Sequence, residues 1–85
     1  MAVESVFNAA TDRPVAVGIH AGIVYVTTVS GQVLTTPLAL HPWLANATPD
    51  QQRHYEPGYV SVYWPDLDEG LDVEWLLMQP ENAHP

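Results

Sequence analysis

The run from Ile23 to Val29, IVYVTTV, constrains the fold of this chain more than any other stretch. Its β-branched and aromatic residues favour a strand. Ala21-Gly22 precedes the run and Ser30-Gly31 follows it, and each glycine can take the positive φ that tight turns require. Residues 15–20 and 32–36 have strand-like patterns on either side, so the sequence predicts a three-stranded antiparallel meander. The apolar character of the central run predicts a strand that is covered on both faces.

The segment after the meander contains the start signal of a short helix. Thr48 and Gln51 are spaced as in a capping box, in which each side chain accepts a hydrogen bond from the other residue's backbone N–H. Pro49 falls at the first helical position, where its missing N–H costs nothing. Pro57-Gly58 would stop the helix, so we expect it to span residues 49–56.

The stretch 59–77, YVSVYWPDLDEGLDVEWLL, predicts a fourth strand, an acidic turn and a second short helix. Val62 and Trp64 would point to one face of the strand, and Pro65 would end it because proline lacks a ladder donor. Asp72 is placed to cap a final helix of about two turns.

These elements predict one α+β domain over residues 15–79, preceded by a loosely ordered lead-in over 1–14 and followed by a tail over 80–85. We expect the meander and the fourth strand to form one antiparallel sheet. The chain has 85 residues and no cysteine, so its stability must come from packing rather than from disulfides. The residues expected to be buried are Ile23 or Val24, Val62, Trp64, Leu76 and Leu77.

The charge balance restricts the partners of the chain. Ten carboxylates stand against Arg13 and Arg53, with no lysine, which gives a formal net charge of −8. Binding to nucleic-acid phosphates or to anionic membranes depends on Lys and Arg, so neither is expected. A basic protein partner fits this charge, and a homodimer would add stability. The first residues lack the features of a signal peptide, which predicts a cytoplasmic location.

Four strings along the chain resemble one known family. They occur in the same order in the bacterial family called domain of unknown function 2442, in which the string WPDLDE is specific. The resemblance covers residues 15–77 and implies a small α+β domain built from a meander, a helix and a fourth strand. The matching strings are Pro37-Leu38-Ala39, Ala47-Thr48-Pro49, Trp64-Pro65-Asp66-Leu67-Asp68-Glu69 and Val73-Glu74.

The same resemblance bears on function. Some members of the family are fused to a helix-turn-helix and others are paired with a small toxin-like protein, which implies an interaction or regulatory module. No catalytic residues come with the resemblance. The chain departs from the usual pattern of the family at Ser30, His41, Trp43 and Trp75.

The acidic turn is the main candidate for chemistry. A hard cation such as Ca²⁺ takes several carboxylate oxygens. An EF-hand loop that starts at Asp66 fails, however, because Leu71 takes the position of its glycine and Leu77 that of its bidentate glutamate. The histidines lack ligand spacing, and no serine or cysteine lies in a nucleophile motif. We therefore expect no metal, no cofactor and no catalysis. The five carboxylates of the turn region are Asp66, Asp68, Glu69, Asp72 and Glu74.

The leading functional hypothesis is a non-enzymatic interaction or regulatory module, antitoxin-like in form, that docks an acidic and aromatic surface on a basic protein. The alternative is a phage-type inhibitor that mimics nucleic acid and blocks a nucleic-acid-binding protein. A small metal-dependent enzyme is the third and least favoured. The aromatic residues concerned fit either an exposed interface or the edge of the core. The residues expected to contact a partner are Asp66, Asp68, Glu69, Tyr59, Tyr63 and Trp43.

Overall fold

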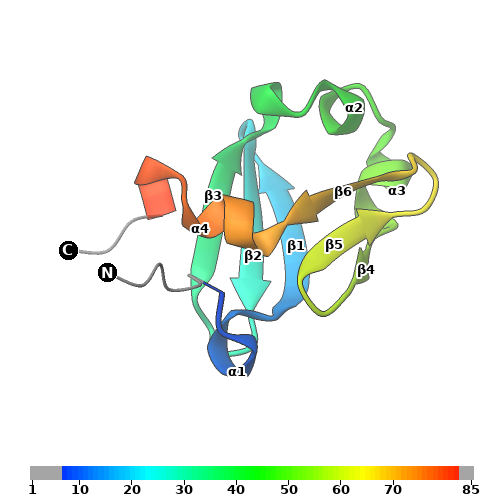
Figure 1. Cartoon of the computed structure of the whole chain (residues 1–85). Coiled ribbons are helices and arrows are strands. Elements are labelled where there is room, and N and C mark those ends of the chain that lie inside the picture. Colours follow the sequence, from blue (N-terminus) through cyan, green and yellow to red (C-terminus); the bar gives the residue numbers. More distant parts are fainter. Residues whose placement is uncertain (1–6, 83–85) are drawn as a thin grey trace.

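The computed structural model describes residues 7–82 of the chain. Two three-stranded antiparallel sheets and several short helices surround one hydrophobic core (Figure 1). The predicted α+β class with an N-terminal meander is confirmed. No helix within residues 7–82 has the length and apolar character needed to cross a membrane.

The first sheet is the predicted meander. It consists of β1 (Pro14–His20), β2 (Ile23–Thr28) and β3 (Val33–Pro37), with β2 in the centre. Ala21 and Gly22 both have positive φ, at 52° and 79°, as in the mirror-image turns that suit the twist of a hairpin. Burial alternates along β2, so one of its faces lines the core while the other is only half-buried. The prediction that both faces are covered is therefore wrong, because the helices and the second sheet lie on one side.

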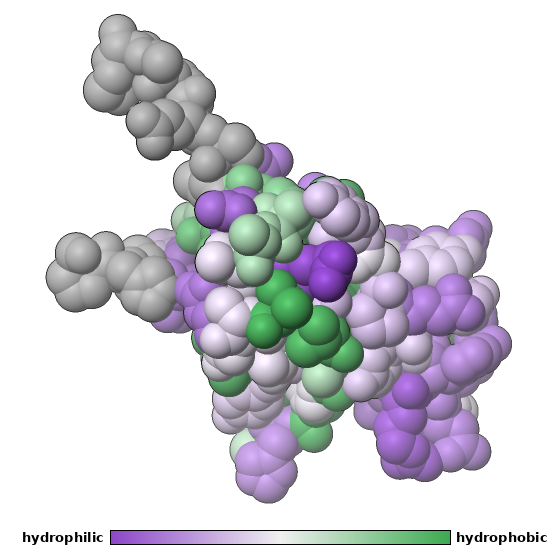
Figure 2. All heavy atoms as spheres, turned by 90° about the horizontal axis from the view of Figure 1, so that it is seen from below, coloured by the Kyte–Doolittle hydropathy of each residue, from purple (hydrophilic) through white to green (hydrophobic). Residues whose placement is uncertain are grey.

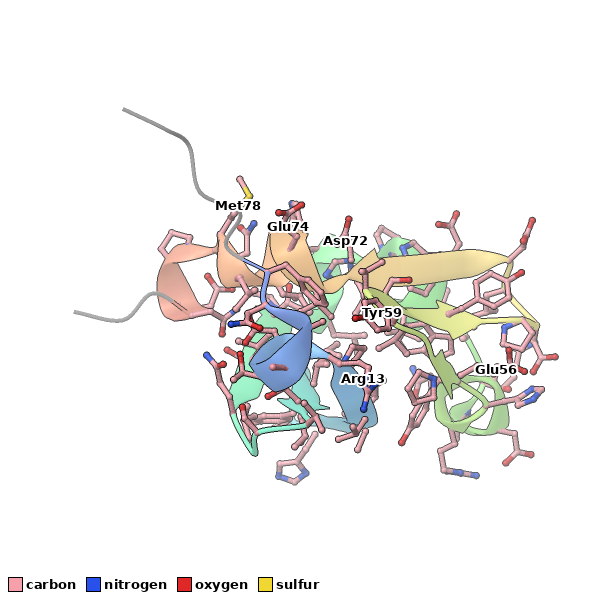
Figure 3. The ribbon with its side chains drawn as sticks, turned by 60° about the horizontal axis from the view of Figure 1, so that its bottom comes forward. Arg13, Glu56, Tyr59, Asp72, Glu74 and Met78 are labelled. Carbon is pink, nitrogen blue, oxygen red and sulfur yellow. The ribbon has the colours of Figure 1, made fainter. Side chains whose placement is uncertain are left out.

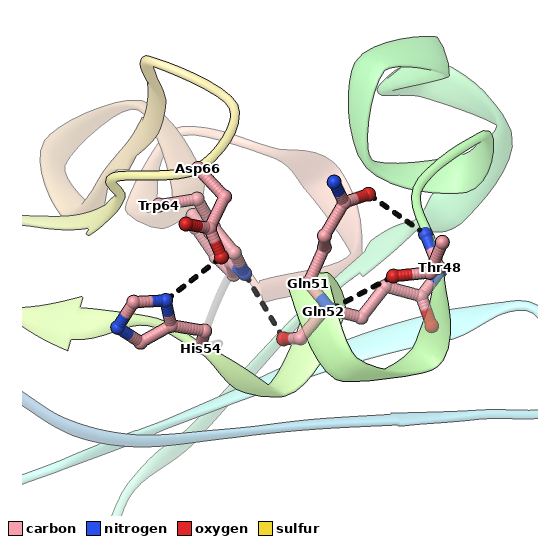
Figure 4. Close-up of polar contacts among 6 residues, drawn as sticks. All are labelled: Thr48, Gln51, Gln52, His54, Trp64 and Asp66. Atoms are coloured by element: carbon pink, nitrogen blue, oxygen red, sulfur yellow. Dashed lines mark hydrogen bonds and ion pairs between the residues drawn. The ribbon is translucent and has the colours of Figure 1, made fainter.

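The connection after β3 contains three short helices. They are the 3-10 helix η1 (Leu38–Leu40), α2 (Pro42–Ala45) and α3 (Pro49–Arg53). The predicted capping box of α3 is present: Gln51 N–H donates to Thr48 Oγ1 over 3.1 Å, and Thr48 N–H donates to Gln51 Oε1 over 3.0 Å (Figure 4). The helix ends at Arg53 rather than at residue 56, because the chain extends there into the next strand.

The second sheet differs from the prediction. It contains β4 (Glu56–Pro57), β5 (Ser61–Trp64) and β6 (Glu69–Asp72), with β5 in the centre. The expected fourth strand is β5, but it pairs with β4 and β6 instead of joining the meander, so the prediction of one four-stranded sheet is wrong. The reason is that the acidic stretch 65–68 is a hairpin turn, which brings β6 back along β5.

Gly70 permits this hairpin to close. A Cβ at Gly70 would lie 2.8 Å from the carbonyl oxygen of Val62 on the neighbouring strand, closer than real Cβ contacts come. On the buried face, Leu71 lies opposite Val62 and joins the core. The glycine and the single apolar residue of β6 explain why its sequence carries little strand signal.

The last helices hold the C-terminal part of the described chain against the first sheet. As predicted, Asp72 caps α4 (Val73–Leu77) by accepting a hydrogen bond from Glu74 N–H over 3.0 Å. The 3-10 helix η2 (Pro80–Asn82) follows, where the sequence predicts a tail. Asn82 is buried, and its amide pairs with the backbone of Thr35 on β3: N–H of Thr35 donates to Oδ1 over 2.8 Å, and Nδ2 donates to the Thr35 carbonyl over 2.9 Å. Residues 83–85 lie outside the described residues.

A short helix also forms in the predicted lead-in. Helix α1 (Ala9–Asp12) is capped by Asn8, whose Oδ1 accepts from Ala10 N–H over 2.9 Å. The Ser30 hydroxyl donates to the Thr11 carbonyl over 2.8 Å, which attaches α1 to the turn between β2 and β3. Residues 1–6 lie outside the described residues.

The core joins both sheets to α2 and α4. Four of the predicted core residues, Val24, Val62, Trp64 and Leu76, are fully buried, whereas Leu77 is half-buried. The Trp64 indole Nε1 donates to the Gln52 carbonyl over 3.0 Å at the C-terminal end of α3 (Figure 4). This bond satisfies a carbonyl that the helix itself leaves without a partner.

An aromatic group surrounds Trp64. Its ring centroid lies 5.4 Å from that of Trp43, and His41 lies 6.0 Å from Trp43 and 5.6 Å from Trp75, all in edge-to-face arrangements. Three of the four positions at which the chain departs from the family pattern therefore lie in one aromatic group, in which His41 contacts both Trp43 and Trp75. Burial lowers the pKa of His41, whose Nε2 lies 3.0 Å from Thr36 Oγ1.

Candidate interaction surface

The turn between β5 and β6 gathers carboxylates at one end of the second sheet. Asp66 and Asp68 lie in the turn itself, and Glu69 begins β6 opposite Trp64. Glu56 of β4 lies directly opposite Tyr63 of β5, so the short strand adds a carboxylate that sequence reasoning placed in a helix. All of these side chains are exposed. We call the group formed by Glu56, Tyr63, Asp66, Asp68 and Glu69 the acidic end.

Two of its side chains orient each other. The Tyr63 hydroxyl donates to Asp68 Oδ1 over 2.7 Å, and this hydrogen bond raises the pKa of Tyr63 above its ordinary value. Asp68 has a positive φ of 52°, a conformation that Asp and Asn tolerate better than most residues. The backbone of the turn thus directs the Asp68 carboxylate at the tyrosine. The pair holds an aromatic ring and a carboxylate together on the surface.

Helix α3 brings cations to the border of the acidic end. His54 Nδ1 lies 2.8 Å from Asp66 Oδ2, and this contact raises the pKa of His54 (Figure 4). Arg53 forms an ion pair with Asp50 within the same helix. Within residues 7–82 neither Glu56 nor Glu69 lies in an ion pair, although the charge of Glu56 also helps to raise the pKa of His54. No feature of the sequence indicates a role for His54, because only its contact with Asp66, which is 12 positions further along the chain, distinguishes it from an ordinary turn residue.

The remaining predicted residues lie elsewhere. Tyr59 precedes β5, and its ring lies 6.4 Å from that of Phe7. Figure 3 shows Tyr59 between Arg13 and Asp72, well apart from Glu56. Trp43 is half-buried against Trp64 and contributes to the core. The structure therefore joins Asp68 to Tyr63 and places Asp66 in the same turn. Glu69 lies at the same end of the hairpin but on the opposite face from Tyr63, because it pairs with Trp64. Tyr59 and Trp43 are separate from this group.

The polarity of the surface changes across the molecule. Figure 2 shows hydrophilic side chains at the end that carries α3 and the β5–β6 turn, and apolar side chains in the middle of the face seen from below. Val15, Tyr59 and Val60 are among the exposed large apolar residues of the chain. Among the residues that the structure describes, no three His, Asp or Glu side chains are grouped so that they could hold a metal ion.

The comparison with protein families matches residues 14–80 to Protein of unknown function (DUF2442). The chain belongs to the DUF2442 family. The match confirms the resemblance and includes both sheets, α4 and the acidic end, so these are parts of a DUF2442 domain. Searches of curated proteins and of solved structures found no match.

Proposed function

We propose that this DUF2442 domain is a non-enzymatic interaction module that docks its acidic end on a basic protein partner. The observation that carries the proposal is the concentration of exposed carboxylates at the β5–β6 turn and on β4, where neither Glu56 nor Glu69 lies in an ion pair within residues 7–82. An antitoxin-like role, in which the domain covers a basic surface of a small toxin-like protein, is the form that the family resemblance favours.

The geometry suits an encounter with a positive surface. Exposed carboxylates at the rim of an interface accelerate association with an oppositely charged partner, while a nearby aromatic ring supplies contact area. Tyr63 is about two-fifths exposed, and Asp68 holds its hydroxyl. By contrast, acid–base catalysis needs carboxylates in a pocket that separates their pKa values. Here they protrude from a hairpin turn.

A matched pair of charge variants tests the proposal. The partner would first be identified by co-purification from the source organism, then purified, and its association rate measured at low and at physiological salt. We expect Asp68→Asn/Glu69→Gln to slow association several-fold at low salt, and the difference to shrink as the Debye length falls to about 8 Å at physiological ionic strength. Asn at position 68 keeps the positive φ and can still accept the tyrosine hydrogen bond.

The control is Glu74→Gln/Glu81→Gln, which removes the same charge from exposed residues outside the acidic end. We expect this variant to associate at nearly the parental rate. Equal association rates for the two variants would show that only net charge matters and would refute docking through the acidic end.

A further inference from the structure

The two edges of the first sheet differ in a way that determines where another strand can add. Backbone N–H and C=O groups point alternately toward the neighbouring strand and away from it. Thr35 points its groups outward from the β3 edge, and the Asn82 amide takes both of them. The centre of the β3 edge is therefore already hydrogen-bonded to a side chain of the same protein.

The β1 edge lies near α3 and β4, but its outward backbone groups at Val17 and Ile19 have no such partner within residues 7–82. His20 and Ile23 flank the two-residue turn, so they form a hydrogen-bonded pair, and Gly18 opposite Tyr25 is the next such pair. Val17 and Ile19, which lie between these positions, therefore direct their backbone groups away from β2. Within residues 7–82, neither makes a backbone hydrogen bond to a residue outside the sheet.

A hollow lies along this edge. It has a volume of about 300 Å³ and is lined by Val17, Gly18 and Ile19 of β1 and by Pro49, Gln52 and Arg53 of α3. Because successive side chains of a strand point to opposite faces, three consecutive residues line one hollow together along the edge of the strand. Apart from its chain neighbours, no atom lies within 4 Å of the place where a Cβ of Gly18 would be, so the face of β1 is open at this position.

The charged residues near the hollow indicate what kind of segment could bind there. Helix α3 carries Asp50, and β4, which also contacts β1, carries Glu56. Among the residues that the structure describes, Arg53 is the one cation that lines the hollow, and it is already paired with Asp50. A second copy of the chain would bring another formal charge of −8 to the same place. An extended segment that carries lysine or arginine is attracted by the net negative charge of the chain, and the one cation that it meets, Arg53, is paired with Asp50.

We propose that the β1 edge at Val17–Ile19 binds an extended basic segment of the partner protein as an added β-strand, in the hollow between β1 and α3. The inference rests on the proposed function, since the same basic partner would contact the acidic end. The backbone of the segment would pair with Val17 and Ile19, and its basic side chains would lie near Asp50 and Glu56.

The test uses the whole chain and a short peptide of alternating lysine and valine with blocked ends. The readouts are the affinity from an NMR titration and the hydrogen exchange of single backbone amides. At saturation we expect the amides of Val17 and Ile19 to exchange about tenfold more slowly, whereas the amide of Val33 on the other edge should be unchanged. A peptide N-methylated on the amides that face β1, and a glutamate–valine peptide, should each bind about tenfold more weakly or worse.

Two protein variants complete the test. Val17→Pro removes an outward N–H without breaking the ladder to β2 and should weaken peptide binding, while Val33→Pro makes the same change on the β3 edge and should not. Binding of the N-methylated peptide as tight as that of the parent peptide would overturn the inference even if a variant fails to fold. Slow exchange of Val17 and Ile19 without peptide, increasing with protein concentration, would assign the edge to a second copy and would also overturn it.

The outcomes separate this inference from the proposed function. If Asp68→Asn/Glu69→Gln associates with the partner as fast as the parent while the β1 amides are still protected by peptide, the acidic end fails and the strand addition stands. If the charge variant slows association but no peptide protects the β1 amides, the proposed function stands and the strand addition is refuted.

Discussion

Replacing Trp64 tests whether the two sheets depend on one common core. The indole is fully buried, lies 5.4 Å from Trp43 and 6.2 Å from Tyr55 between ring centroids, and donates to the Gln52 carbonyl. Truncating a buried tryptophan to alanine costs about 3–5 kcal/mol. The Gln52 carbonyl would lose its partner, which adds about 1 kcal/mol. The free energy of unfolding of a chain this size is about 4–13 kcal/mol, so Trp64→Ala should remove between about a third and all of it.

The assay is urea denaturation followed by far-ultraviolet circular dichroism, which does not depend on tryptophan fluorescence. The control is Trp75→Ala, because Trp75 is 38% exposed and leaves a smaller cavity. We expect Trp75→Ala to cost about 2 kcal/mol from its buried area alone. If Trp64→Ala costs no more than Trp75→Ala at an unchanged m-value, Trp64 does not hold the sheets together and the reasoning is refuted.

Three further predictions follow from single residues. Ala21→Asn should raise the free energy of unfolding by about 0.5–1 kcal/mol, since Asn accepts the positive φ of 52° better than Ala; an unchanged melting temperature would contradict this. Asn82→Ala should lower the free energy of unfolding by about 2–3 kcal/mol in the same urea assay, because three hydrogen bonds to backbone groups of Thr35 and Leu76 are lost; a loss below 1 kcal/mol would show that η2 is only loosely attached. In Asp66→Asn, the pKa of His54 measured by NMR should fall back toward its ordinary value of 6.5. Because the folded-state pKa is the higher one in the parent, the contact stabilises the fold below pH 6.5 and loses this effect as the pH rises through the raised pKa. A His54 pKa that is equal in both proteins would contradict the contact.

Features that depend on a few neighbouring residues could be predicted from the sequence. The turn at Gly22 follows from a glycine between two strand patterns, and the capping box at Thr48 follows from residues three apart. The Asp72 cap is equally local. Each of these signals acts within one turn of the backbone, so the tertiary structure did not change them.

The division of strands between two sheets could not be predicted in this way. Strand β4 is only two residues long, and β6 contains one apolar side chain beside Gly70, so neither shows an alternating pattern. Their pairing with β5 depends on contacts across the hairpin and across the turn at Gly58. The role of Asn82 was equally hidden, because its partner Thr35 is 47 positions away in the sequence.

For the candidate surface, the sequence predicted neighbours correctly only within the single hairpin formed by β5 and β6. Asp68 and Tyr63 are hydrogen-bonded because the turn between β5 and β6, which also contains Asp66, brings them together. Tyr59 has the same even spacing from Tyr63 as residues on one strand face, but β5 begins only at Ser61. Spacing in a sequence indicates a common face only while the strand continues.

The Asn82 side chain has a consequence for how large an assembly of this protein can become. An assembly that grows by adding strand to strand needs two free edges on the same sheet of every molecule, as in a fibril. In this protein one edge of the first sheet is capped by an amide of the same chain, fixed by hydrogen bonds of 2.8 and 2.9 Å. A strand that adds at β1 therefore finds no second edge on which the next molecule could continue. If a partner segment adds at β1 as proposed, we therefore expect a stoichiometry of one segment per chain.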